Sequence, residues 1–211
     1  MQTITIGIIG SGNVGGTLGT RWAQAGHAVT FGSRRPDSKE MQELVAKAGS
    51  TARAASAAEA AQADVLLLAT PWPATEEALR SAGDLTGKIL IDATNPLLNL
   101  DGLELGTTTS GGEQVAQWAR GAKVVKAFNT VGNNIMADPS FGDRRPALLY
   151  CGDDAAAKGI VRTLVEELGF EPIDAGPLEL SRTLEPVALL WISLALKQGL
   201  GREFAFQLMR R

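Results

Sequence analysis

The segment Ile4–Gly15, with the sequence ITIGIIGSGNVG, decides how the rest of the chain folds. Its first half is an apolar run rich in β-branched residues, which predicts a buried parallel strand. Its second half, GSGNVG, matches the G-x-G-x-x-G pattern of a dinucleotide-binding turn. Apolar residues then recur at helical spacing until Gly26, so strand, glycine turn and helix follow in the order that the pattern requires.

The glycine turn predicts a site for the pyrophosphate of a dinucleotide. Gly10 is expected to make the tight turn, Gly12 to let the backbone approach the pyrophosphate, and Gly15 to let helix and strand pack closely. The helix N-terminus adds free N–H groups and a partial positive charge. The candidate cofactor-binding residues of this turn are Gly10, Ser11, Gly12, Asn13, Val14 and Gly15.

The end of the second predicted strand indicates which dinucleotide binds. Ala28–Gly32 runs into Ser33, Arg34 and Arg35, about twenty residues past the glycines, where an NAD site would carry a carboxylate for the ribose hydroxyls. Two guanidinium groups and a hydroxyl suit a 2′-phosphate instead. We therefore expect NADP(H), with a solvated basic turn as the alternative interpretation of the same residues.

Composition excludes several classes of protein. The chain has 211 residues, a formal net charge of −3, one cysteine and one histidine. The acidic balance argues against a nucleic-acid partner, and no apolar stretch reaches the roughly 20 residues that span a bilayer. One cysteine permits no internal disulfide, and the first strand begins too early for a signal peptide, so we expect a cytoplasmic protein without a membrane partner. The common zinc clusters are excluded, and no metal site is predicted.

Three further apolar segments, 64–69, 88–93 and 123–127, predict strands that all end in proline, asparagine or threonine. In an open parallel sheet, ligands bind outside the carboxyl ends of the strands. We therefore expect the residues at these ends to line the nicotinamide side of one crevice: Thr70, Pro71, Trp72, Asn95, Pro96, Leu97, Asn129 and Thr130. The alternative is that these residues simply end strands and make turns.

Between these strands, helical spacing predicts a helix over 37–49 and a short alanine-rich helix over 54–62, entered from Ser56 as N-cap. The glycine- and threonine-rich segment 99–112 is either a flap over the site or an ordinary surface loop. A helix over 114–119 should follow it.

In the last third we expect a strand over 146–152, a helix capped by Asp153 that ends at Gly169, and an edge strand over 171–174. A helix from Glu179 towards Lys197 is apolar nearly all round, which fits burial either at a subunit interface or within one chain. The fold class is thus α/β, with a Rossmann-type, doubly wound, mostly parallel sheet and a small C-terminal helical extension. We expect an NADP-binding domain over 1–145 and a small C-terminal region over 146–211 that completes the acceptor site and forms an oligomer interface.

Few side chains are available for proton transfer. His27 lies in the turn before the second strand, at the amino ends of the sheet, and is expected to be structural. The only tyrosine, Tyr150, lies in a strand, so the Tyr-x-x-x-Lys pair of many carbonyl reductases is absent. Lys126 is either a proton donor or, as a strand residue, structural. Asn129 is the best candidate for orienting the nicotinamide amide or the acceptor ring, and no catalytic residue is assigned.

The whole chain resembles the family of NADP oxidoreductases that use the deazaflavin coenzyme F420. The resemblance lies in GSGNVG, the GSRR turn at 32–35, Thr70-Pro71-Trp72, the strand 124–130, CGDD at 151–154 and DAGPL at 174–178. It implies a Rossmann domain, NADP(H) binding, hydride transfer to or from the deazaflavin, and a homo-oligomer, which we expect to be a homodimer through the C-terminal helix. By position, the resemblance also implies that Asn133 contacts the cofactor, together with residues 10–14, Ser33, Arg34 and Trp72.

One departure from the family bears on the acceptor. Better-known members carry a histidine where this chain has Asn129, and GSG replaces their frequent GTG. The K-x-F-N pattern at 126–129 is similar to that of the cytosolic reductase domain of six-transmembrane metalloreductases. We therefore expect an NADPH-dependent oxidoreductase acting on F420, with a soluble flavin or metal-chelate reductase as one alternative. A non-catalytic NADP(H)-sensing regulatory protein is the alternative from another class.

Overall fold

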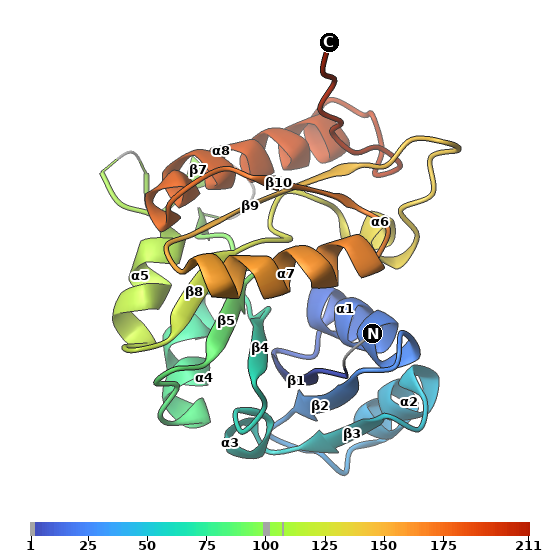
Figure 1. Ribbon diagram of the computed structural model, residues 1–211, viewed down its shortest axis with the longest axis vertical. Helices are drawn as coiled ribbons and strands as arrows, with labels where there is room; N and C mark the ends of the chain where they lie inside the picture. The colour runs from blue at the N-terminus through green and yellow to red at the C-terminus, as the bar shows by residue number, and fades with distance from the viewer. Residues whose placement is uncertain (1–2, 99–101, 107) are drawn as a thin grey trace.

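The computed structural model describes residues 3–98, 102–106 and 108–211, and it is built on one eight-stranded sheet with helices on both faces (Figure 1). Neighbouring strands of this sheet are parallel except for β8 and β9, while β6 and β7 form a separate antiparallel pair. The strands are β1 (Thr5–Ile9), β2 (Ala28–Gly32), β3 (Ala52–Ala55), β4 (Val65–Leu68), β5 (Ile89–Asp92), β6 (Leu97–Leu98), β7 (Gly102–Leu103), β8 (Lys123–Lys126), β9 (Ala147–Gly152) and β10 (Glu171–Asp174).

The strand order confirms the predicted doubly wound sheet. The eight strands lie in the order β10-β9-β8-β5-β4-β1-β2-β3. The chain therefore runs outward from β1 through β2 to β3, and then returns to the other side of β1 with β4, β5 and β8. The winding reverses between β1 and β4, and ligands bind at such a switch point in open α/β sheets.

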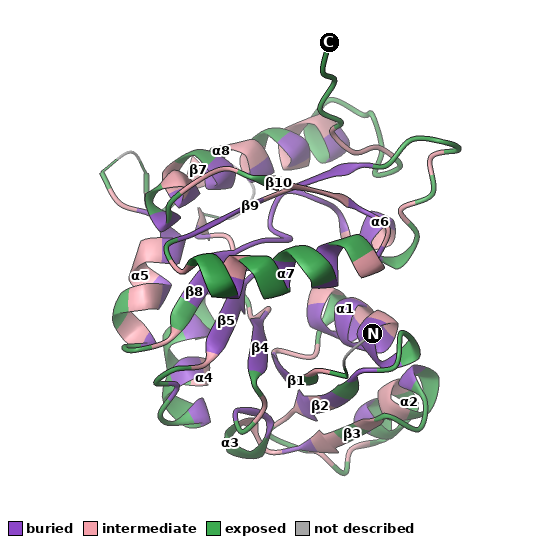
Figure 2. Cartoon of the chain, viewed as in Figure 1, coloured by how far each residue is buried: buried purple, intermediate pink, exposed green. Residues whose placement is uncertain are grey.

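Helices cover both faces because the strand residues alternate between two apolar layers. In β4, Val65 and Leu67 join the larger core cluster, while Leu66 and Leu68 join the smaller one. Figure 2 shows the buried strands between the exposed outer sides of the helices. The helices are α1 (Asn13–Gln24), α2 (Lys39–Ala48), α3 (Ala57–Ala60), α4 (Thr75–Ala82), α5 (Gly111–Trp118), α6 (Asn133–Ala137), α7 (Ala155–Glu167) and α8 (Ser181–Ile192), with short 3-10 turns at Trp72–Ala74 and Leu178–Leu180 and a π-helical turn at Ser193–Lys197.

Two local predictions were wrong. Ala54 and Ala55, expected in a helix, lie in β3, because Ala52–Ala55 pairs in register with β2 and tertiary pairing overrides the helix propensity of alanine. The helix itself begins at Ala57, with the predicted capping box between Ser56 and Glu59. In α7 the cap is Asp154, whose Oδ1 accepts from Ala157 N at 2.8 Å, while Asp153 accepts from Leu178 N instead.

The C-terminal region adds β9 and the edge strand β10 to the same sheet, with α7 and α8 packed around them (Figure 1). Trp191 of α8 stacks on Phe204 of the terminal segment at 5.3 Å between ring centroids. Leu190 and Leu196, by contrast, each expose about half of their surface. The apolar helix is thus buried only partly within the chain. No helix among the described residues is long and apolar enough to cross a membrane.

We expect Cys151 to be unreactive in the folded protein. Its side chain is buried on β9, 3.5 Å from Ser181 Oγ, and burial raises the pKa of the thiol to about 11. The nucleophilic thiolate is therefore scarce at pH 8. Mass spectrometry after iodoacetamide treatment should find Cys151 unmodified in native protein and alkylated in urea. Rapid modification of the native protein at pH 8 would contradict this prediction.

Candidate functional site

A cleft of about 420 Å³ opens where the carboxyl ends of β1, β4 and β5 meet. This is the switch point of the sheet, where the sequence predicts the crevice. Eight of the predicted site residues line it, together with Ala69, Pro73, Ala93 and Thr94, which the sequence analysis did not name. The eight are Gly12, Asn13, Val14, Thr70, Pro71, Trp72, Asn95 and Leu97. Ala69, Pro73 and Thr94 adjoin predicted residues, and Ala93 lies two positions before Asn95, so the strand ends themselves were the signal for all four.

The glycine turn at the edge of the cleft fits a pyrophosphate. Gly10 has φ +97°, and a Cβ on it would lie 2.7 Å from the backbone of Ala69, so the turn requires glycine. A Cβ on Gly12 would meet nothing within 4 Å, which leaves open space beside the backbone. Gly12 caps α1 without a side-chain hydrogen bond, so the first N–H groups of the helix remain available to an anion.

The basic turn lies beside this glycine turn. Ile9 of β1 pairs with Gly32 of β2, and the hydroxyl of Ser11 donates to Gly32 O at 3.1 Å. Ser33 Oγ in turn accepts from Arg35 N at 3.0 Å, which orders the turn. The side chains of Arg34 and Arg35 are exposed. Two exposed guanidinium groups thus lie next to the turn, an arrangement that suits a 2′-phosphate.

Three of the predicted residues, Trp72, Pro96 and Thr130, are buried. Trp72 is almost fully buried and packs against Trp118 of α5, with ring centroids 5.2 Å apart. Pro96 is buried close to Gly111, at the start of α5. Thr130 is buried as well. Trp72 lines the cleft together with Thr70 and Asn95, whereas Pro96 and Thr130 are not among its lining residues.

Asn95 and Asn129 form a pair whose orientation is fixed by their partners. Asn95 Nδ2 donates to the backbone oxygen of Asn129 at 3.0 Å, so Asn95 Oδ1 must face the other amide. Asn129 Nδ2 donates to that oxygen at 3.2 Å and to Leu184 O at 3.3 Å. Asn129 Oδ1 is then left buried with no hydrogen-bond partner in the described part of the chain. A buried unpaired acceptor is costly, and a ligand that donates a hydrogen bond to it would remove that cost.

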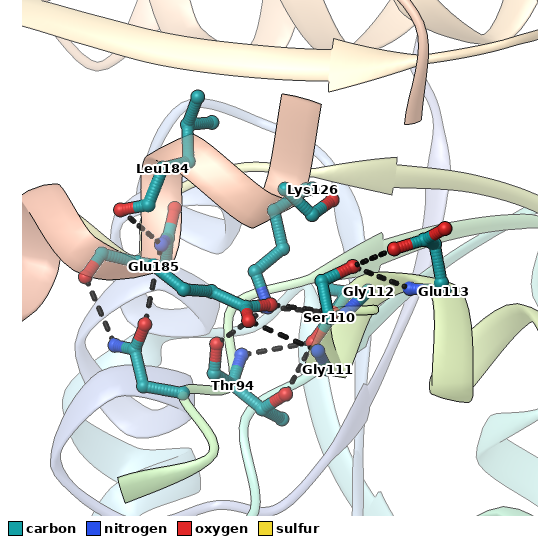
Figure 3. Close-up of polar contacts among 12 residues, drawn as sticks. Thr94, Ser110, Gly111, Gly112, Glu113, Lys126, Leu184 and Glu185 are labelled. Atoms are coloured by element: carbon teal, nitrogen blue, oxygen red, sulfur yellow. Dashed lines mark hydrogen bonds and ion pairs between the residues drawn. The ribbon is translucent and has the colours of Figure 1, made fainter. Parts of the chain in front are cut away.

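Lys126, the last residue of β8, is fully buried. Figure 3 shows it close to Thr94 and Glu185. Its ammonium donates to Asp92 Oδ2 at 2.9 Å and to Thr94 O at 2.7 Å, and it contacts Glu185 Oε1 at 2.8 Å. Burial alone would lower the pKa of Lys126, but the two carboxylates outweigh burial and raise that pKa. An ammonium has three N–H donors, and all three are engaged here. Lys126 is therefore not available as a proton donor to a substrate.

The remaining candidates lie outside the cleft. Asn133 begins α6, and Arg202 of the terminal segment donates to its Oδ1. His27 lies at the amino ends of the strands, the end of the sheet opposite to the cleft. There its Nδ1 accepts from Ile4 N and its Nε2 lies 2.7 Å from Glu167. Segment 99–112 contains β7, which pairs with the preceding β6, and the start of α5, but residues 99–101 and 107 lie outside the described residues.

Comparison with known proteins identifies the family. A family model described as "NADP oxidoreductase coenzyme F420-dependent" matches residues 5–96. A candidate F420-dependent NADP reductase of known structure from Arthrobacter sp. FB24 is 33% identical, with a TM-score of 0.88 over 98% of this chain and 100% of that one. The F420-dependent NADP reductase of Methanocaldococcus jannaschii is 29% identical over 89% of this chain and 90% of its own length.

Two further likenesses concern part of a longer protein and the fold. Metalloreductase STEAP3 of Rattus norvegicus is 32% identical over 87% of this chain, which spans only 36% of that protein's length. A reductive aminase from Aspergillus terreus in complex with NADPH has the same fold, with 22% identity and a TM-score of 0.66 over 94% of this chain and 64% of that one. The chain therefore belongs to the F420-dependent NADP oxidoreductase family and is an NADP-dependent oxidoreductase related to the reductase domains of the STEAP metalloreductases.

Proposed function

We propose that this protein transfers a hydride between NADPH and the deazaflavin F420. The observation that carries the proposal is the cleft at the switch point, which has the glycine turn on one side and the ends of β4 and β5 on the other. NADPH supplies the hydride chemistry when bound, so the protein has only to align two rings and exclude water. The names of the Arthrobacter and Methanocaldococcus relatives support F420 as the acceptor.

The proposed cofactor site uses three groups of residues. The open backbone at Gly12 and the uncapped N-terminus of α1 would hold the pyrophosphate. Arg34, Arg35 and the Ser33 hydroxyl would hold the 2′-phosphate. The nicotinamide would then lie along the strand ends, beside Thr70 and Asn95, with Pro71, Trp72 and Leu97 in the rest of the lining. Pro96 follows Asn95 in the chain, and Asn129 is hydrogen-bonded to Asn95, so both would support this wall.

The chemistry of the site favours an aromatic acceptor ring. Lys126 has no free donor, and His27 lies at the far edge of the sheet, so neither side chain offers a proton at the cleft. A carbonyl or imine substrate needs such a donor, whereas a deazaflavin or flavin spreads the added charge over its rings. Asn129 Oδ1, a buried acceptor beside Asn95 with no partner among the described residues, would suit a ring N–H or the nicotinamide carboxamide instead.

Replacing Asn129 with alanine tests this orienting role. We expect Asn129→Ala to lower kcat/KM for the acceptor about 10- to 100-fold, because a misaligned ring loses the near-attack geometry. Initial rates at saturating NADPH, with the acceptor varied, give this ratio. The control is Asp143→Ala, a substitution at an exposed residue, which should keep the wild-type kcat/KM. Unchanged turnover and unchanged acceptor affinity in Asn129→Ala would remove Asn129 from the site.

The identity of the acceptor can be tested by following the decrease in NADPH absorbance. The acceptors offered are F420, FMN and FAD separately, and a ferric chelate with and without flavin. Oxidation with F420 alone supports the proposal. Oxidation with flavin or chelate, but not with F420, would replace it with the second candidate, which the likeness to STEAP3 favours. Tight NADPH binding with no oxidation by any acceptor would favour a redox-sensing protein.

We also propose that residues 146–211 complete the acceptor site. In addition, we propose that the chain pairs with a second copy of itself through α8 and the turn that follows it. Leu190 of α8 and Leu196 of the π-helical turn, each about half exposed, support this pairing. Light scattering should give a dimer mass for the purified protein and a monomer mass for the double variant Leu190→Glu/Leu196→Glu. A wild-type monomer would overturn the pairing. Placement in the cytoplasm stays a prediction.

A further inference from the structure

The Lys126 cluster joins three parts of the chain that meet at the redox site. Asp92 ends β5, Lys126 ends β8, and Glu185 belongs to α8 (Figure 3). Every polar group in it is matched: Asp92 Oδ1 accepts from the backbone N and the hydroxyl of Thr94, at 2.9 and 2.7 Å. A fully buried ionic cluster is rarely retained for stability alone, because apolar residues of the same volume often serve as well.

Glu185 extends the cluster to the start of α5. Its two carboxylate oxygens accept from Gly111 N and Gly112 N, at 2.9 and 3.0 Å. Glycine is needed there, since a Cβ on Gly111 would lie 3.0 Å from the carboxylate and one on Gly112 would lie 2.4 Å from Ser181 Oγ. The partial positive charge of the helix N-terminus adds to that of the ammonium in holding the second carboxylate.

The residues that accept hydrogen bonds from the Asn129 amide are sequence neighbours of residues that bind Lys126. The Asn129 amide donates to Asn95 and to the Leu184 carbonyl. Asn95 follows Thr94, whose carbonyl accepts from the Lys126 ammonium. Leu184 precedes Glu185, whose carboxylate forms an ion pair with the same ammonium. Both acceptors that orient Asn129 are therefore one residue away from a partner of Lys126.

The segment between Lys126 and Asn129 contains a strained residue. Phe128 has φ +64°, a left-handed value that costs energy for a bulky residue. Its ring is held edge-on by Trp22 and Phe170, with centroids 5.7 and 6.5 Å away. Only Ala127 and this strained residue separate Lys126 from Asn129 along the chain.

Resting on the proposed function, we propose that Lys126, Asp92 and Glu185 are positioning residues that hold the Asn95–Asn129 pair in one orientation, with Asn129 Oδ1 presented as an acceptor to the reacting rings. The cluster makes no contact with the ligands in this proposal. It acts through the Thr94 carbonyl and the backbone of α8.

Glu185→Gln tests this with little change of volume. Glu185 Oε1 faces Lys126 and Gly112 N, and Oε2 faces Gly111 N, so the new NH₂ group meets a donor in either orientation. The matched control is Glu113→Gln. Glu113 also ties α5 to α8, through Arg182 at 2.6 Å, but lies outside the cluster. Both variants thus remove one charged link between the same two helices.

The expected kinetic result is a kcat about 10- to 100-fold lower in Glu185→Gln, because small misalignments of reacting groups slow the hydride step. The NADPH Kd should be unchanged, and 4-deuterated NADPH should give a larger isotope effect on kcat than in the wild type. Glu113→Gln should keep wild-type values of all three. Equal losses of kcat in the two variants, or wild-type kinetics in Glu185→Gln, would overturn the proposal.

A second measurement does not depend on turnover. In ¹⁵N-labelled protein, the side-chain amide signals of Asn95 and Asn129 should shift in Glu185→Gln and stay in place in Glu113→Gln. Unmoved amide signals in Glu185→Gln would overturn the positioning role even if the enzyme is active. If the wild-type protein does not oxidise NADPH with any of the acceptors offered, the proposed function is overturned instead, and the amide signals still decide whether the cluster orients the pair.

Discussion

Replacing Lys126 with methionine should lower the free energy of unfolding by about 3 to 5 kcal/mol, because the change leaves two buried carboxylates without their cation. Asp92 and Glu185 are both almost fully buried, so water cannot replace the ammonium without opening the fold. Urea denaturation followed by circular dichroism measures the loss. Lys123→Met on the same strand is the control, since its pair with Asp154 is partly exposed and contributes at most about 1 kcal/mol.

The same cluster predicts how stability depends on pH. The pKa of Lys126 is raised in the folded protein, so its contribution is fully present below the usual lysine pKa of about 10.4 and is lost as the pH rises through the raised value. The difference in stability between wild type and Lys126→Met should therefore be constant from pH 7 to 9 and shrink at strongly alkaline pH. A difference below about 1 kcal/mol at pH 7 would mean that the buried charges are compensated in another way.

The sequence predicts the first half of the site well because its signals are local. The strand, the glycine turn and α1 are encoded within residues 4–26, and the carboxyl ends of β4 and β5 follow from short apolar runs. Parallel strands bring these ends together by topology alone. The residues that line the cleft were therefore predictable without any knowledge of side-chain contacts.

The sequence predicts less where partners lie far apart in the chain. Lys126 could be interpreted as a donor or as a structural residue, because its partner Asp92 lies 34 positions away and Glu185 lies in another third of the chain. The available signal was three charged residues in otherwise apolar segments, each of which needs a buried partner. Strand β3 was missed for a related reason: its alanines favour a helix, and only pairing with β2 makes them a strand.

The basic turn after β2 carries the second large prediction, on cofactor choice. Replacing Arg34 with aspartate should weaken NADPH binding about 30- to 1,000-fold, which corresponds to about 2 to 4 kcal/mol of lost phosphate contact and added repulsion. NADH lacks the 2′-phosphate, so its affinity should change little. Isothermal titration calorimetry with both nucleotides gives the ratio of the two Kd values, and that ratio, rather than either Kd, measures the role of the guanidinium.

Arg53→Asp provides the matched control. Arg53 is exposed on β3, where it pairs in register with Thr30 of β2, so the substitution makes the same change of charge away from the strand end. If the preference for NADPH depends on general positive charge, both variants should lose it to a similar extent, and the contact assigned to Arg34 is wrong. If only Arg34→Asp loses the preference for NADPH, the phosphate must be held at the end of β2, next to the turn that Gly10 makes possible. That position fixes the direction in which the dinucleotide crosses the sheet towards Asn95.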